Sequence, residues 1–197
     1  MRRPLVLLLG VVILTGSSAT AQTVTREQAV RAAIHPVSND QIMREWLSRV
    51  PLTRDFPPDF LATLRGEAPA FVIEMTTARG CVPCADLWAK LQQAHRQYGL
   101  RIGLLSRDDA ALRSGHLGLP WVGNPVAWVR PIDDANKTIP IAIGTDHRVN
   151  LARNIYLAFK MLTGVKPDVG VRAMAKFTGI VGTQPQRMPV HTRRSGN

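Results

Sequence analysis

Apolar residues along this chain form two kinds of pattern, short continuous runs and runs with helical spacing. The short runs predict strands at Ala70–Met75, Leu100–Leu105, Val126–Val129 and Ile139–Ile143. Between the first two runs, apolar residues recur at steps of three and four from Cys84 to Tyr98. Residues at these steps share one helix face, which predicts a helix that begins at Cys81 and ends at Gly99.

The last strand is followed by Val149–Leu162, where the same spacing predicts a second long helix. A short helix is also predicted over Asp108–Ser114. The short distance between the third and fourth strands favours an antiparallel hairpin. The order is therefore strand, helix, strand, loop, strand, strand, helix, which can form one four-stranded mixed sheet flanked by helices. We expect an α/β domain of this kind over residues 67–165.

The two flanks of this domain have different patterns. Residues 22–66 are polar with helical spacing and predict a helical extension, in which Thr25 and either Asn39 or Asp40 cap helices. Pro36 is expected to end the first of these helices. Residues 166–197 are poorly patterned and basic, so we expect a poorly structured tail.

The first 21 residues have the features of a signal peptide. Two arginines follow Met1, Leu5–Leu14 is apolar, and Ala19-Thr20-Ala21 fits a cleavage site before Gln22. The alternative is an uncut membrane anchor, for which the apolar run is short. We therefore expect a mature protein that is exported, with a periplasmic location.

Charge adds a second expectation about partners. The chain has a formal net charge of +11, and no acidic residue follows Asp168. Such a tail can contact acidic polymers, anionic lipid headgroups or an acidic protein; the simpler interpretation is a solvated basic segment. No aromatic residue follows Phe177 and no nucleic-acid-binding motif is present, so nucleic acid is not an expected partner.

The chain has only two cysteines, in the motif Cys81-Val82-Pro83-Cys84. A disulfide across so small a ring stabilises by only about 2 kcal/mol in the loop-entropy model, so reactivity explains the spacing better. At the helix N-terminus the dipole and the backbone N–H groups stabilise a Cys81 thiolate, and Arg79 adds positive potential. Cys84, one turn further on, can resolve a mixed disulfide. Pro83 fits the first helical turn.

The sequence also allows other roles for the cysteine pair. A zinc site needs four ligands, but there is no second cysteine pair and the five histidines lack ligand spacing. An inert structural disulfide or a degenerate redox domain also fits the pattern. We expect no metal and no dissociable cofactor, only a redox-active Cys81–Cys84 disulfide.

At this point the chain resembles the thioredoxin-like superfamily. The matching features are the strand Ala70–Met75, the CxxC motif that opens a helix, and Asn124-Pro125 leading into a strand, with Pro125 placed 41 residues after Cys84. The resemblance implies that Asn124–Pro125 is a cis peptide beside Cys81, with Pro120 as the second candidate. It also implies that Asn124, Pro125, Val82 and Pro83 bind the substrate near the sulfurs.

The chain departs from the family pattern at several positions. Gly80 stands where many members have an aromatic residue, and Asn124 stands where Thr, Val or Ile is usual. Glu74 is near the place of the family's buried proton-transfer acid, one residue out of spacing, so it is a candidate for that role or an edge acid. The Val-Pro dipeptide is similar to that of exported reductases and favours reduction or isomerisation over oxidation.

Two functions follow as hypotheses. The first is periplasmic thiol–disulfide exchange of the reductase or isomerase type, acting on the thiols or disulfides of exported proteins and supplied with electrons by a redox partner. The alternative is a non-catalytic or accessory thioredoxin-like component that docks on an envelope assembly, such as a conjugation or secretion apparatus. Trp121 is a candidate for lining a substrate groove, whereas Trp88 and Trp128 are expected in the core.

Overall fold

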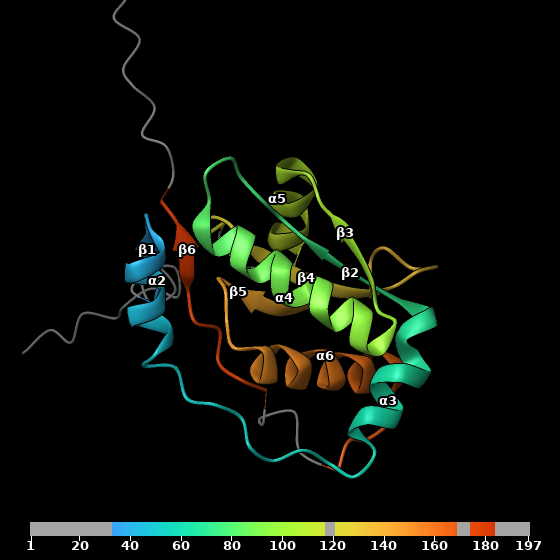
Figure 1. The fold of residues 1–197 in the computed structure, drawn as a ribbon. Coiled ribbons are helices and arrows are strands. Elements are labelled where there is room, and N and C mark those ends of the chain that lie inside the picture. Colours follow the sequence, from blue (N-terminus) through green and yellow to red (C-terminus); the bar gives the residue numbers. More distant parts are fainter. Residues whose placement is uncertain (1–32, 117–120, 169–173, 184–197) are drawn as a thin grey trace, which may run out of the picture.

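The computed structural model describes residues 33–116, 121–168 and 174–183, and its centre is a four-stranded mixed sheet (Figure 1). The strands are β2 (Phe71–Met75), β3 (Arg101–Leu104), β4 (Val126–Pro131) and β5 (Ile139–Ile143). Their order in space is β3-β2-β4-β5; β3 runs parallel to β2, and β4 runs antiparallel to β2 and β5. The expected α/β fold class, the mixed sheet and the antiparallel hairpin are confirmed.

Helices cover both faces of this sheet. They are α4 (Val82–Tyr98) and α6 (Arg148–Thr163) on one face and α5 (Arg107–His116) on the other. Alternation along the strands explains the two layers, because successive side chains point to opposite faces. Ile73 of β2 packs in the main core with Leu87 of α4 and Ile155 of α6. Trp128 of β4 packs with Ala110 of α5 in a second cluster.

The predicted helical extension contains two helices and also a strand. These elements are β1 (His35–Val37), α2 (Asp40–Leu47) and α3 (Phe60–Glu67), and the 3-10 turn η1 (Ala68–Ala70) follows at the start of the domain. Asn39 caps α2 as expected, since its Oδ1 accepts a hydrogen bond from Ile42 N at 3.0 Å. Pro36 does not end a helix but lies within β1, which corrects the purely helical prediction for residues 22–66. Thr25 lies outside the described residues.

The C-terminal segment also differs from its prediction. Strand β6 (Ile180–Gly182) pairs in parallel with β1 and makes a second, two-stranded sheet. All three β6 residues are buried, and Ile180 packs in a separate apolar cluster with Val37 and Met43. The expectation of a poorly structured tail over residues 166–197 is therefore wrong for β6, because this short apolar run has a partner strand at the other end of the sequence.

Polar side chains on α6 fasten the extended flanking segments to the domain. Asn150 accepts a hydrogen bond from Thr53 N at 2.8 Å, and Asn154 accepts one from Ala175 N at 2.8 Å. Both asparagines are buried, so these bonds also satisfy polar groups that water cannot reach. The flanks are thus attached to the same helix that supports the sheet.

The predicted signal peptide, residues 1–21, lies outside the described residues, as do residues 184–197 of the predicted tail. Within the part of the chain that the structure describes, no helix has the length and the apolar character needed to cross a membrane.

Candidate functional site

The two cysteines form a disulfide at the start of α4. Their Cα atoms are 5.2 Å apart, within the usual range for a disulfide. Cys81 is the N-cap residue of α4, and its carbonyl accepts hydrogen bonds from the amides of Cys84 and Ala85. Cys81 is half-buried, whereas only 2% of Cys84 is exposed. An incoming thiol or disulfide therefore has access to Cys81 rather than to Cys84.

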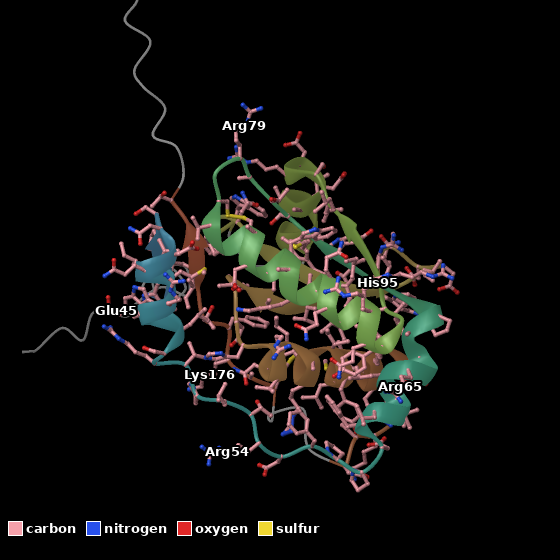
Figure 2. The ribbon with its side chains drawn as sticks, in the orientation of Figure 1. Glu45, Arg54, Arg65, Arg79, His95 and Lys176 are labelled. Atoms are coloured by element: carbon pink, nitrogen blue, oxygen red, sulfur yellow. A yellow bond between two sulfur atoms is a disulfide. The ribbon has the colours of Figure 1, made fainter. Side chains whose placement is uncertain are left out.

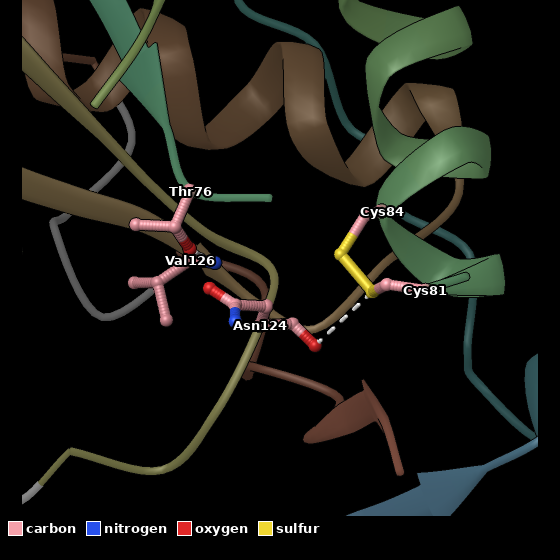
Figure 3. Close-up of a disulfide and its surroundings, with 5 residues drawn as sticks. All are labelled: Thr76, Cys81, Cys84, Asn124 and Val126. Carbon is pink, nitrogen blue, oxygen red and sulfur yellow. Dashed lines mark hydrogen bonds between the residues drawn. A yellow bond between two sulfur atoms is a disulfide. The ribbon is translucent and has the colours of Figure 1, made fainter. Parts of the chain in front are cut away.

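The turn before β4 lies beside this disulfide. The Asn124–Pro125 peptide bond is cis, as the resemblance implied, and the Asn124 carbonyl oxygen lies 3.7 Å from Cys81 Sγ (Figure 3). Figure 3 also shows the Asn124 side chain directed away from the sulfurs. The fold thus joins two segments that are 40 residues apart in the sequence and presents the backbone of Asn124, rather than its amide side chain, to Cys81.

Thr76 fixes the position of this turn, although the sequence did not single out Thr76 as a site residue. The Thr76 amide donates to Val126 O at 2.9 Å, and Thr76 Oγ1 accepts from Val126 N at 3.0 Å. Thr76 is 1% exposed, so neither bond competes with bulk water. The signal available in the sequence is a polar residue placed directly after a buried strand.

Glu74 lies on the other face of the sheet from the disulfide. Its carboxylate accepts hydrogen bonds from Arg130 at 2.9 and 3.0 Å and from Arg113 at 2.7 Å. Burial opposes ionisation, but the two guanidinium groups outweigh it and lower the pKa of Glu74. Since Ile73 and Met75 pack in the cluster that holds Cys84, strand alternation places Glu74 away from it. Glu74 is therefore not positioned for the predicted proton transfer.

The two residues between the cysteines are only partly available to a substrate. Pro83 is buried in the first turn of α4, and Val82 is half-buried against the apolar cluster of α2, β1 and β6. Val82 also lines a groove of about 450 Å³ beside the sulfur pair. Of these two predicted substrate contacts, Val82 has the more suitable position.

The groove beside the disulfide is mainly apolar. Its walls include Met75, Val82, Trp88 and Leu104 together with both cysteines. Trp88 thus has two environments, because it packs partly against the main core and also faces the groove. The groove runs along α4 and the end of β3, next to the Cys81–Cys84 disulfide.

The other two tryptophans that we considered lie elsewhere. Trp128 is 1% exposed and belongs to the core, as expected. Trp121 packs against the cluster of Val126, Trp128 and Ala110 on the α5 face, and it is not among the residues that line the groove. The groove beside the sulfurs therefore does not support the prediction that Trp121 lines a substrate groove.

Gly182 of β6 is a further site residue that the sequence did not indicate. Its amide donates to the Asn124 carbonyl at 2.8 Å. A Cβ atom added at position 182 would lie 2.8 Å from Cys81 Sγ. The run Gly179-Ile180-Val181-Gly182, apolar between two glycines, is a strand signal that was available, but nothing in it indicates the partner.

Charge around the site is modest. Figure 2 shows Arg79 at the tip of the loop between β2 and α4, directed outward from the molecule, so solvent screens its effect on Cys81. Among the described residues, no group of three or more His, Cys, Asp or Glu side chains is arranged to hold a metal ion. The Cys81–Cys84 pair itself is compatible with thiol–disulfide exchange.

Comparison of the chain with protein-family models, with curated protein sequences and with solved structures gives no match.

Proposed function

We propose that this chain is a thiol–disulfide oxidoreductase with a thioredoxin-like domain. The observation that supports this most strongly is the pairing of a half-exposed Cys81 at a helix N-terminus with a buried Cys84, both next to a cis-proline turn. The strand order β3-β2-β4-β5 with its parallel and antiparallel pairs is what a βαβ unit followed by a ββα unit produces. The family resemblance of the motif and of Pro125 supports the same assignment.

The reaction follows from the different exposure of the two sulfurs. The Cys81 thiolate attacks one sulfur of a substrate disulfide, and the other substrate sulfur leaves as a thiolate. The Cys84 thiolate then attacks Cys81 Sγ, which forms the internal disulfide and releases the second substrate thiolate. Two electrons pass from the dithiol to the substrate, and a reducing partner protein restores the dithiol. The Asn124 carbonyl and Pro125 border the position of the mixed disulfide.

The substrates in this proposal are exported proteins that carry thiols or disulfides, and the location is the periplasm. The predicted signal peptide over residues 1–21 supports the location. The Val-Pro dipeptide between the cysteines supports a reductase or isomerase rather than an oxidase.

A second candidate is an accessory, non-catalytic component that docks on an envelope assembly such as a conjugation or secretion apparatus. It is favoured by a second, mainly apolar groove next to α2 and β6, which is lined by Trp46, Val50, Leu52 and Phe177 among others. Replacing both cysteines with alanine distinguishes the two functions. Co-purification with the assembly that survives this double change supports docking, whereas its loss supports exchange chemistry.

The test of the proposed function is the reduction potential of the Cys81/Cys84 pair, measured in glutathione buffers by thiol alkylation. A value near about −270 mV indicates a reductant that needs an electron supply, and a value near about −120 mV indicates an oxidant. A pair that never closes, or that stays oxidised far below this range, would contradict exchange chemistry and leave docking as the better account.

A further inference from the structure

Strand β6 is bonded on both of its edges. One edge pairs with β1. On the other edge, Gly182 N donates to Asn124 O at 2.8 Å and Ile180 O accepts from Thr145 N at 3.1 Å. β6 is therefore held between β1 and the segments that border the disulfide, and its backbone groups have no free edge for another strand.

The close approach of β6 to the sulfurs requires glycine. A Cβ atom at position 182 would lie 2.8 Å from Cys81 Sγ and 3.3 Å from Cys81 Cβ. Contacts as short as 2.8 Å force something to move, so a larger side chain that does not bond to Cys81 Sγ would displace β6 or the disulfide. The backbone at Gly182 thus lies in contact with the reactive residue.

This contact uses a residue, Asn124, that the family resemblance assigns to substrate binding. An extended peptide bound beside the sulfurs would pair its backbone with Asn124, whose carbonyl faces Cys81. In this structure the Gly182 amide already bonds to that carbonyl. An extended segment of a partner protein cannot take the same place while β6 is present.

The apolar groove reaches the sulfurs from another side. Among the described residues that line it, none belongs to β6 or to the Asn124–Pro125 turn. Its rim includes Leu104, which is 60% exposed, and half-buried Trp88. An apolar side chain next to a partner's cysteine would gain burial on these two residues while its sulfur lies at Cys81.

We propose that β6 is a built-in strand that fills the substrate position at Asn124, and that partner proteins deliver their sulfur to Cys81 through the groove lined by Trp88 and Leu104. The partner class is a protein segment in which an apolar side chain neighbours the cysteine. This proposal rests on the proposed exchange function and adds a route and a preference to it.

The position of β6 is tested with the variant Gly182→Cys in a Cys84→Ser background. A Cβ atom at position 182 would lie 3.3 Å from Cys81 Cβ, close to the usual Cβ–Cβ separation of about 3.5–4.5 Å in a disulfide. Mild oxidation should form a disulfide between Cys81 and the cysteine introduced at position 182, which mass spectrometry of peptides detects.

The matched control is Gly66→Cys in the same background, since nothing lies within 4 Å of a Cβ at position 66. This control should form no disulfide with Cys81. Absence of the Gly182→Cys bridge, or equal bridging in the control, would overturn the proposal.

The groove is tested with the reduced wild-type chain by comparing exchange rates for two disulfide-labelled peptides of equal length. Leucine flanks the cysteine in one peptide, and serine flanks it in the other. We expect the leucine peptide to react roughly five- to tenfold faster, and Leu104→Arg to bring the ratio near one. Leu112→Arg, at an equally exposed leucine on α5, should keep the ratio.

The outcomes of the peptide experiment separate this inference from the proposed function. Equal rates for the two peptides, or the same loss of preference in Leu112→Arg and Leu104→Arg, would overturn the route through the groove while exchange itself still occurs. If neither peptide nor a small disulfide such as hydroxyethyl disulfide reacts with the reduced chain, the proposed function itself fails, and this inference fails with it.

Discussion

Arg130 binds both carboxylate oxygens of Glu74 across the neighbouring strands β4 and β2, with its Nη2 at 2.9 Å from Oε1 and its Nε at 3.0 Å from Oε2. Arg113 of α5 adds a third bond. Two-pronged pairs of this kind are among the strongest charged contacts in proteins. The side chains of Glu74 and Arg113 are 13% exposed and that of Arg130 is 20% exposed, so this cluster is one of the main polar attachments between α5 and the sheet.

Glu74→Gln should destabilise the fold without changing the chemistry of the sulfurs. Two partly buried guanidinium groups would lose their charged partner, for which we expect a cost of about 2 kcal/mol in the free energy of unfolding. Urea titration measures that cost, and the reduction potential of the cysteine pair should stay the same. A large fall in the rate at which Cys84 resolves mixed disulfides would instead restore Glu74 as a proton-transfer residue.

The same cluster makes stability depend on acid. The pKa of Glu74 is lowered in the folded chain, so its ionised form stabilises the fold fully at pH values above the ordinary glutamate pKa of about 4.3. This contribution is lost as the pH falls through the lowered folded pKa. Between about pH 6 and pH 3, the unfolding temperature should fall less steeply with decreasing pH for Glu74→Gln than for the wild type. Parallel curves for the two proteins would contradict the stabilising role of ionised Glu74.

Thr76→Val tests the attachment of the cis-proline turn. The change keeps the side-chain shape but removes the hydroxyl that accepts from Val126 N, which leaves a buried amide with no partner and should cost about 1–3 kcal/mol. Chemical denaturation gives the size of the effect. Thr77→Val, at the exposed neighbouring position, is the control and should change stability by less than about 0.5 kcal/mol.

Substitutions at the two cysteines should have different effects on thiol–disulfide exchange. Cys81→Ala should abolish exchange with any disulfide substrate, because the half-exposed sulfur is the one a substrate can reach. Cys84→Ser should accumulate mixed disulfides with substrate, since the resolving sulfur is gone. Mass spectrometry after incubation with a reducible protein separates the two. Turnover by Cys81→Ala would show that the reaction does not begin at Cys81.

Asn154→Ala should loosen β6 from a distance. Asn154 accepts from Ala175 N and donates to Ile141 O at 2.9 Å, and it therefore anchors the segment that leads into β6. Its loss should speed hydrogen exchange at the amides of residues 180–182 and raise the alkylation rate of Cys81 in the reduced protein. The hydrogen-exchange rates of the β2 amides should change much less. Equal acceleration in β2 and β6 would mean that the whole fold, rather than the flank, was weakened.

The spacing of apolar residues within each segment was enough to predict the strands and helices of the central domain. The strands at residues 71–75 and 139–143 and the helix that follows the CxxC motif are each specified by spacing within the segment itself. The meeting of Cys81 with Asn124–Pro125 was predictable only through family resemblance. No pattern within either segment indicates the other.

Two outcomes had physical causes that local pattern does not contain. Glu74, a candidate for proton transfer that was one residue out of spacing, lies on the face away from Cys84, because a shift of one residue along a strand exchanges the two faces of a sheet. β6 was missed because its partner β1 lies more than 140 residues earlier in the sequence. Pairings between such distant segments depend on the completed fold rather than on neighbouring residues.

The parallel pair of β1 and β6 divides the molecule into parts with different resistance to opening. The small sheet has two short strands and an apolar cluster of its own, whereas the four-stranded sheet shares a much larger core with α4 and α6. Cooperative units with few buried contacts open at a lower free energy than the whole domain. We therefore expect the backbone that contacts Cys81 to open at a lower free energy than the four-stranded domain, so that partial opening exposes more of Cys81 while this domain stays folded.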